Sequence, residues 1–406
     1  MRDRRAIPIA LLAILVAAPA HAVPFRDRFS ATAAQIGLQG GGAFDALGDE
    51  IADTVARNLP VISASAGFTY RYNPQLEVFE RTSDTLGPIF MERPDTIGQG
   101  KLNINVSYES VQMNELDGTM TKHLQGNNGE PIIVRVTDAS GTLLGFTANE
   151  LKYNFKLLNN VVGFSGTYGV LDNLDVNLFI PLLSTDFDVT ATTKQQFVAG
   201  TDGVFAPQPG PSLSSKLSGT KTNIGDILLR SKYQLPTWDI WRSALGLWFR
   251  LPSGDKANFQ GTGDFEVSPF FYASTLLWSR VEPHLNLGLD LRTDNVSESD
   301  GRYDVGVDAD ITRRINIALA FLGRSQFEGS ASASETNFLY LTPNGAALKP
   351  LLGIQFDRKD YFDFSFGARA VVWRQIMVFA NGIYAINSEG LRNDSVIPVF
   401  GLEGTF

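Results

Sequence analysis

Histidine is the residue type on which catalysis by this chain would most plainly depend, and few histidines are present. Beyond the first 22 residues the sequence holds only His123 and His284. A hydrolase site would pair a histidine with a serine or an acidic partner. His123 has no motif around it, and His284 follows a short turn at Ser279. This pattern favours a histidine that lines a polar interior, and we predict that the chain is not an enzyme.

Two other groups of residues could suggest ligand sites. Gly254, Gly261 and Gly263 resemble a phosphate loop in composition, but no helix follows and no lysine has the required spacing. The absence of cysteine excludes disulfides and thiolate metal sites. A set of acidic residues lacks the spacing of an EF-hand calcium loop: Asp186, Asp188, Glu298, Asp300 and Asp304. We therefore expect no metal and no cofactor.

Charged side chains recur instead at alternate positions of apolar segments. In residues 241–252, leucines alternate with Arg242, Trp248 and Arg250. A strand points successive side chains to opposite faces, and a charge on the lipid face at mid-depth costs about 2–4 kcal/mol. The charged face should therefore line a lumen. The residues predicted to line it are Asp226, Arg230, Lys232, Arg242, Trp248, Arg250, Glu266, His284, Asp290, Arg292, Asp363 and Arg369.

The elements that would position these residues are β-hairpins, of which residues 161–183 are the clearest. Apolar residues alternate with small or polar ones on both arms, and Leu171, Asp172 and Asn173 form the turn. About ten residues per arm suffice for a tilted strand to cross a bilayer. Further hairpins are predicted at 224–252, 265–292, 303–323 and 362–387, with single arms from 101, from 151 and over 396–406.

The connections between these arms alternate between short and long. Short turns lie near Asp172, Trp238, Ser279, Arg313 and Arg374, whereas 115–150, 199–223 and 328–360 are long and polar, as exposed loops are. Membrane barrels place short turns in the periplasm and long loops outside. The sequence predicts an all-β fold: a transmembrane antiparallel β-barrel of about 12 strands, or 14 if residues 63–73 belong to an additional hairpin.

The N-terminus predicts export. Arginines precede an apolar run that ends in Ala20-His21-Ala22, the pattern of a cleaved signal peptide. We expect a leader at 1–22, a lead-in or plug segment at 23–99 with an amphipathic helix over 43–58, and a barrel over 100–406, in the Gram-negative outer membrane. Removing the leader shifts the formal charge from −9 to about −11, which argues against nucleic acid as a partner.

The C-terminus adds a second membrane signal. Phe406 is in phase with Leu402 and Phe400, the pattern that barrel-insertion machinery reads, so we expect that machinery as a partner beside outer-membrane lipid. A soluble β-sandwich would also alternate polar and apolar residues. It explains neither this terminal phenylalanine nor the alternation of short turns with long loops.

Several stretches in order resemble the outer-membrane proteins of the phenol meta-pathway type. They are 169–175, the segment 225–229 with Lys232 and Tyr233, 251–255 with 261–263, and 390–392 with the closing strand. Gly404 stands where that family usually has an aromatic residue, and 115–150 and 199–223 are local elaborations. The resemblance implies a barrel and transport.

The function that we predict is passive transport of a small hydrophobic or aromatic compound, bound among phenylalanine and tryptophan side chains and passed inward or sideways. Two alternatives stay open. The barrel could be structural or adhesive, acting through its external loops, or it could be an outer-membrane enzyme that depends on His123 or His284.

Overall fold

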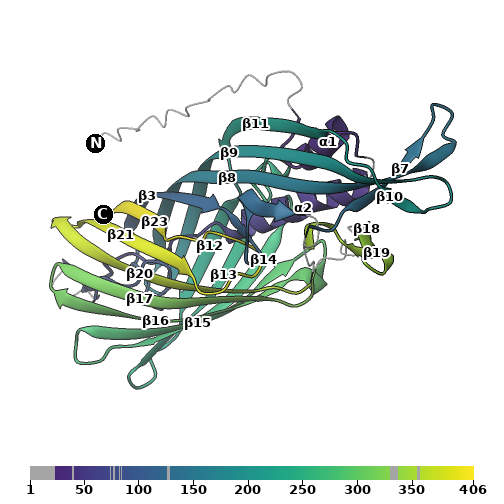
Figure 1. Cartoon of the computed structure of the whole chain (residues 1–406). Helices are drawn as coiled ribbons and strands as arrows, with labels where there is room; N and C mark the ends of the chain where they lie inside the picture. The colour runs from purple at the N-terminus through teal and green to yellow at the C-terminus, as the bar shows by residue number, and fades with distance from the viewer. Residues whose placement is uncertain are drawn as a thin grey trace.

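The structure is a computed structural model that describes residues 23–38, 41–73, 75, 78–81, 83, 85–125, 129–329, 337–353 and 357–406, so the predicted leader lies outside the described residues. An antiparallel sheet closes on itself to form a barrel (Figure 1). The predicted barrel of about 12 strands is confirmed. Within the described residues, twelve strands form its wall: β3 (Leu102–Met113), β8 (Leu143–Leu171), β9 (Leu174–Ala199), β12 (Ile227–Gln234), β13 (Trp241–Leu251), β14 (Glu266–Thr275), β15 (Val281–Arg292), β16 (Asp300–Thr312), β17 (Ile315–Gln326), β20 (Asp360–Trp373), β21 (Ile376–Ala385) and β23 (Ile397–Thr405).

One end of the barrel carries the short turns, and both ends of the wall lie there. β23 pairs with β3 to close the ring, and Leu102 and Phe406 exchange backbone hydrogen bonds of 2.9 and 2.7 Å. Because membrane barrels place short turns in the periplasm, we call this the periplasmic end and the opposite end the external end.

The two faces of the wall differ as a membrane barrel requires. On β3, Leu102, Ile104 and Val106 are 37–47% exposed, whereas Asn103 and Asn105 between them are 4% exposed. The apolar side chains meet lipid and the polar ones point inward. Among the described residues, no helix has the length and apolar character needed to cross a membrane. The wall thus has the apolar outer face and the polar inner face of a transmembrane β-barrel.

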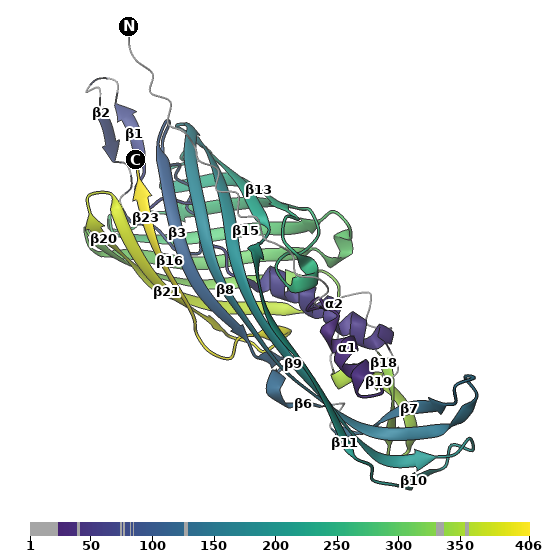
Figure 2. The same cartoon turned by 90° about the horizontal axis from the view of Figure 1, so that it is seen from above.

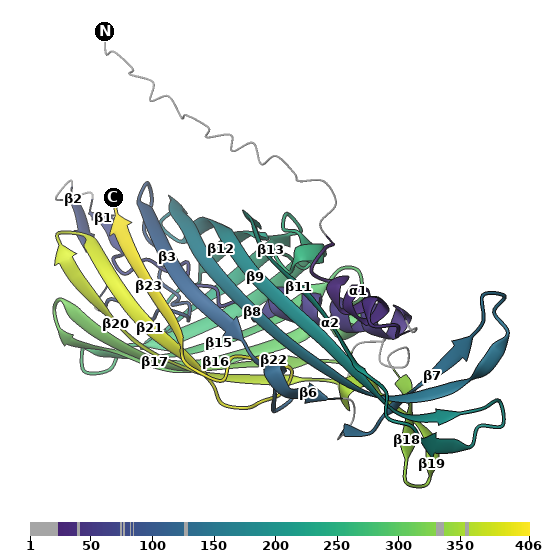
Figure 3. The ribbon, with the colours of Figure 1, turned by 45° about the horizontal axis from the view of Figure 1, so that its top comes forward.

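Three strands extend well past the others at the external end (Figures 2 and 3). β8 has 29 residues and β9 has 26, far more than the ten or so that a crossing needs. β11 (Ser212–Ile224) continues β12 outward and pairs with β9 from Leu182 to Lys194. The prediction of a loop over 199–223 was therefore wrong, because this range contains nearly all of β11. It also contains the short strand β10 (Phe205–Pro207). β11 is polar on both faces because it lies beyond the lipid, so its sequence lacks apolar alternation.

The external connections contain short elements. Residues 115–150, predicted to be a loop with small strands, hold β4 (Glu115–Leu116), β5 (Thr119–Met120), η1 (Thr121–His123), β6 (Leu124–Gln125) and β7 (Ile132–Thr137), but β8 begins at Leu143 and not near Leu151. The other external elements are η3 (Lys256–Asn258), η4 (Val296–Glu298), β18 (Asn337–Thr342), β19 (Gly345–Pro350), η6 (Leu351–Gly353) and β22 (Leu391–Arg392), the last pairing with β4.

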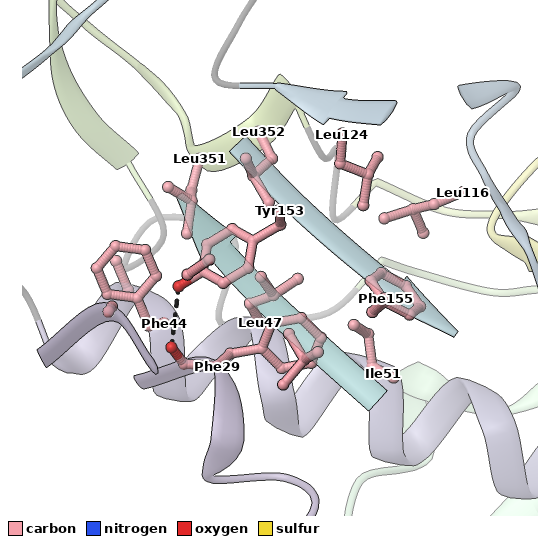
Figure 4. Close-up of a cluster of buried hydrophobic side chains, with 14 of the residues drawn as sticks. Phe29, Phe44, Leu47, Ile51, Leu116, Leu124, Tyr153, Phe155, Leu351 and Leu352 are labelled. Atoms are coloured by element: carbon pink, nitrogen blue, oxygen red, sulfur yellow. Dashed lines mark hydrogen bonds between the residues drawn. The ribbon is translucent and has the colours of Figure 1, made fainter. Parts of the chain in front are cut away.

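The N-terminal helices lie at the external end. α1 (Arg28–Gln35) contacts β9 and β11, and α2 (Gly41–Asn58) agrees with the helix predicted over 43–58. Its apolar face packs with α1 against Tyr153 and Phe155 of β8 (Figure 4), and Tyr153 donates a hydrogen bond of 2.9 Å to the carbonyl of Phe29. Expected as a periplasmic or lumenal lead-in, this segment is external because its apolar partners lie on the extension of β8.

The described residues between 59 and 98, which we call the inner segment, then run through the barrel to the periplasmic end. The carbonyl of Ile62 accepts a hydrogen bond from Arg230 in the wall, and the amide of Ile97 donates to Asp175 near the periplasmic turn. A small hairpin of β1 (Tyr70–Asn73) and β2 (Val78–Arg81) forms its own two-stranded sheet near the C-terminus (Figure 2). Residues 63–73 therefore add no strand to the wall.

Candidate functional site

Glu92 fixes the inner segment to β12 by a buried charge cluster. This carboxylate is 4% exposed, and it lies 3.8 Å from Nζ of Lys232 and 4.0 Å from a guanidinium nitrogen of Arg230. The amide of Ala64 donates to it at 2.5 Å, and the Ser65 hydroxyl also donates to it. A buried carboxylate is tolerated only when it is paired and hydrogen-bonded in this way. The cluster therefore sets the position of the inner segment inside the ring.

Two further wall arginines hold the inner segment nearer the periplasmic end. Arg242 donates to Asp95 at 2.7 Å, and Arg369 donates to the carbonyl of Leu86 at 2.9 Å. Arginine suits such contacts because its rigid fork of donors stays charged when buried. The inner segment is thus attached to opposite parts of the wall.

A third charged network joins helix α2 to the external half of the wall. Arg57 is buried and pairs with Asp53 at 3.0 Å and with Glu266 of β14. Arg292 of β15 approaches Asp53 to 3.3 Å. Burial by itself would raise the pKa of Asp53, but the guanidinium groups of Arg57 and Arg292 hold that pKa below its ordinary value. The network therefore stabilises an ionised Asp53 at the point where the helix meets the barrel.

A cavity of about 140 Å³ lies between the start of the inner segment and the wall strands β16, β17, β20 and β21. One part of its lining is cationic and another is apolar. The cationic part is Arg57, Arg302, Arg324 and Arg392, with Asp304 and Asp363 beside them, and the apolar part includes Val61, Phe90, Val111, Met113, Leu322, Tyr361, Ile383 and Ile397. Pockets that bind small molecules have this character: mostly apolar walls with a few placed polar groups.

A smaller cavity of about 30 Å³ lies on the other side of the same part of the inner segment. Leu59, Pro60 and Val61 line both cavities. Phe179 and Leu228 contribute apolar walls to the smaller one. Residues 59–61 therefore lie between two spaces within the barrel.

The loop that follows β13 lies beside β11, which extends past the end of β13, and this loop takes the place of a paired strand there. Asp226, between β11 and β12, accepts hydrogen bonds from the amides of Gly254 and Thr262 at 3.0 and 2.7 Å. Gln260 of the same loop donates to the carbonyl of Lys221 on β11 at 2.9 Å. These contacts satisfy polar groups that an unpaired strand edge would leave open. Asp226 is thus an anchor for the loop that closes this part of the wall.

His284 lies in a buried polar cluster in the periplasmic half. Its Nε2 is 2.5 Å from Asp308, and Glu282, His284 and Asp308 bring possible metal-ligand atoms within 4.8 Å of one another. The carboxylates already have partners, because Arg242 donates to Glu282 at 2.7 Å and Asn316 donates to Asp308 at 2.7 Å. These contacts give the cluster a structural explanation without an ion.

The residues predicted to line the lumen fall into several groups. Arg230, Lys232, Arg242 and Arg369 bind the inner segment, and Glu266 and Arg292 bind helix α2, as described above. Trp248 donates to Tyr272 at 2.9 Å, and Asp290 pairs with Arg302. Asp226 and Arg250 border the smaller cavity, and Asp363 borders the larger one. A transport role for this set stays a prediction.

The four arginines of the larger cavity were not predicted. Arg302 and Arg324 had a signal, because Arg302 is in phase with the inward Asp304 on β16, and Arg324 is in phase with Leu322 on β17. Arg57 and Arg392 lie outside the wall strands, on α2 and β22. Alternation along a strand says nothing about such residues, because their position depends on tertiary packing.

Comparison with known proteins agrees with the family resemblance. A family model described as "Putative MetA-pathway of phenol degradation" matches residues 135–372. Comparison with curated protein sequences gives no match.

Solved structures with a similar fold are outer-membrane barrels. They include the COG4313 outer membrane channel from Pseudomonas putida F1, at 10% identity and a TM-score of 0.45, covering 77% of this chain and 97% of that one. A FadL homologue from Pseudomonas aeruginosa matches at 10% identity and a TM-score of 0.32, covering 75% and 89%. The toluene transporter TbuX from Ralstonia pickettii matches at 11% identity and a TM-score of 0.26, covering 79% and 94%. TM-scores of this size identify no function for the present chain.

Proposed function

The chain belongs to the phenol-degradation family whose model matches it, and on that premise we propose that its barrel carries small hydrophobic or aromatic compounds passively across the outer membrane. The observation that most supports this proposal is the cavity of about 140 Å³ between the inner segment and the wall. Its lining combines apolar side chains with a few charged ones, as binding sites for small organic molecules do.

The inner segment determines how a compound would pass. Residues 59–61 separate the two cavities, and the wall contacts of Glu92, Asp95 and Leu86 hold the rest of the segment in place. A compound bound in the larger cavity would advance when the stretch at 59–61 shifts, while the charge clusters keep the segment inside the barrel. Such passage runs down a concentration gradient and uses no cofactor.

Uptake by whole cells tests the proposal directly. Gram-negative cells that produce the barrel are compared with cells that carry an empty vector, with radiolabelled phenol and toluene as probes. We expect a higher initial rate of uptake in the cells with the barrel, at equal cell density. Equal rates in the two cell populations would rule out transport of these compounds.

A second function has support from the extended external strands. β8 and β9 continue far beyond the length needed to cross the bilayer, and Leu144, Val204 and Leu348 at this end are 58–73% exposed. An adhesive role would use this external surface, which lies beyond the lipid. Deleting residues 200–211 tests the adhesive role: loss of cell-surface binding with unchanged phenol uptake would support adhesion, and unchanged cell-surface binding would remove the support for it.

A further inference from the structure

The larger cavity holds a guanidinium group without a carboxylate partner. Arg324 donates to the carbonyl of Arg57 at 3.1 Å and to the side-chain oxygen of Asn58. Among the described residues, no carboxylate forms an ion pair with it, in contrast to Arg57, Arg302 and Arg392. Removing a cation from water without an anion is costly. The carboxylates of Asp300 and Asp363 act on this guanidinium from a distance, but neither forms an ion pair with it, so its half-buried charge can accept a direct contact from an anion outside the chain.

Arg392 adds an unused donor to the same place. It is 6% exposed and pairs with Asp363 at 2.5 Å, but its buried Nε has no hydrogen-bond partner in the described part of the chain. Both guanidinium groups also lie against one aromatic ring, because Arg324 and Arg392 stand 4.3 and 5.2 Å from the centre of Tyr361. Asp363 is the carboxylate that both cations already share, by an ion pair with Arg392 and at longer range with Arg324, and one negative charge does not balance two positive ones.

The rest of the cavity limits what that anion can be. Val111, Met113, Leu322 and Ile383 line it with apolar side chains. A dry apolar cavity of roughly 150 Å³ is enough to hold one benzene ring, and this cavity measures about 140 Å³. The available space therefore limits the ligand to a single ring, whose polar group would lie at the charged part of the lining.

We propose that the larger cavity binds small aromatic carboxylates, with the carboxylate held by Arg324 and Arg392 and the ring against the apolar lining. This inference rests on the proposed transport function and specifies its substrate class. Arginine holds a carboxylate through two parallel hydrogen bonds, which makes it selective for that planar anion. A neutral ring of the same shape fits the apolar part but gives neither guanidinium an anionic acceptor, and it leaves the buried Nε of Arg392 without a partner.

Calorimetry with two isosteric ligands tests the proposal. Benzoate and benzamide have the same shape and differ in charge, so their affinities are compared on the purified full-length barrel in a neutral detergent at pH 7.5. We expect benzoate to bind at least about tenfold more tightly, as charge-assisted hydrogen bonds would provide. Equal affinities in the wild-type protein would overturn the proposal whatever the variants show.

Substitutions test whether Arg324 causes the preference for benzoate over benzamide. Arg324→Gln should bring benzoate to the affinity of benzamide, and Arg324→Lys should keep part of the preference because it retains the charge without the fork. Arg280→Gln removes an equal charge from an exposed periplasmic turn and should leave the preference unchanged. Retention of the full preference in Arg324→Gln, in protein that still shows the heat-modifiable mobility of a folded barrel, would also overturn it.

Uptake separates this proposal from the one on which it rests. Transport of benzamide and toluene without a preference for benzoate would leave the transport function standing and remove the carboxylate specificity. Tight binding of benzoate by a barrel that transports none of benzoate, benzamide and toluene would support the binding site and rule out the transport function.

Discussion

Glu92 is the residue on which the position of the inner segment most depends. It is the carboxylate shared by Lys232 and Arg230, and it also accepts from the amide of Ala64. The wall residues of this cluster were identified by alternation along β12. Glu92 was not identified, because the sequence around a single acidic residue in a segment without periodicity does not indicate which residues it will contact.

Replacing Glu92 with glutamine should destabilise the barrel. The change leaves two buried cations without their anion, and removing one partner of a buried ion pair typically costs about 3–5 kcal/mol. The measurement is the free energy of unfolding in urea, with the protein reconstituted in lipid. Glu328→Gln, at an exposed external position, is the control and should change this free energy by less than about 0.5 kcal/mol. Equal effects of the two substitutions would contradict the role given to Glu92.

Acid should weaken the attachment of helix α2. The pKa of Asp53 is held below its ordinary value of about 3.9, because Arg57 and Arg292 outweigh the effect of burial. A depressed pKa means that the ionised carboxylate stabilises the folded state above pH 4, and that this contribution is lost as the pH falls through the folded-state pKa. Stability measured from pH 6 to pH 2.5 should fall more steeply in the wild-type protein than in Asp53→Asn.

Asp45 provides the matched control for that titration, since it lies exposed on the same helix. Asp45→Asn should follow the wild-type curve throughout. A wild-type curve that coincides with that of Asp53→Asn would show that the ion pairs of Asp53 contribute nothing to the attachment of α2.

At the scale of elements, apolar alternation identified the hairpins that cross the membrane and missed the strands that leave it. β12 to β17, β20, β21 and β23 follow the predicted arms closely, because lipid on one side and polar groups on the other impose a period of two. β11 pairs with β9 over thirteen residues, from Ser212 to Ile224. Its serines, threonines and lysines show no such period because water or protein covers both faces.

The loop after β13 should depend on Asp226. Both carboxylate oxygens accept from the loop, one from Gly254 and one from Thr262. Asp226→Asn removes one acceptor and leaves a buried amide unpaired, at a cost of about 1–3 kcal/mol. We expect faster tryptic cleavage after Lys256 in the variant, measured on the folded protein. Asp239→Asn, in an exposed periplasmic turn, is the control and should leave the cleavage rate unchanged. An unchanged cleavage rate in Asp226→Asn would show that other contacts hold the loop.

At the scale of the whole molecule, the N-terminal segment passes through its own barrel. The apolar helices α1 and α2 bind beneath the extended sheet at the external end, and residues 59–98 return through the ring to the start of β3. Composition and spacing predicted a segment that could enter the lumen. They could not predict its direction, because that depends on Tyr153 and Phe155 lying on a part of β8 that the sequence does not distinguish from a membrane arm.

The central claim, that small aromatic compounds pass through the larger cavity, is tested most directly by filling that cavity. Ala385 on β21 lines it, whereas Val378 on the same strand is 38% exposed on the lipid-facing side. Initial rates of phenol uptake are measured in cells that produce equal amounts of folded wild-type barrel, Ala385→Phe or Val378→Phe. The account predicts uptake at the level of empty-vector cells for Ala385→Phe and at the wild-type level for Val378→Phe. Wild-type uptake by a correctly folded Ala385→Phe barrel would contradict it.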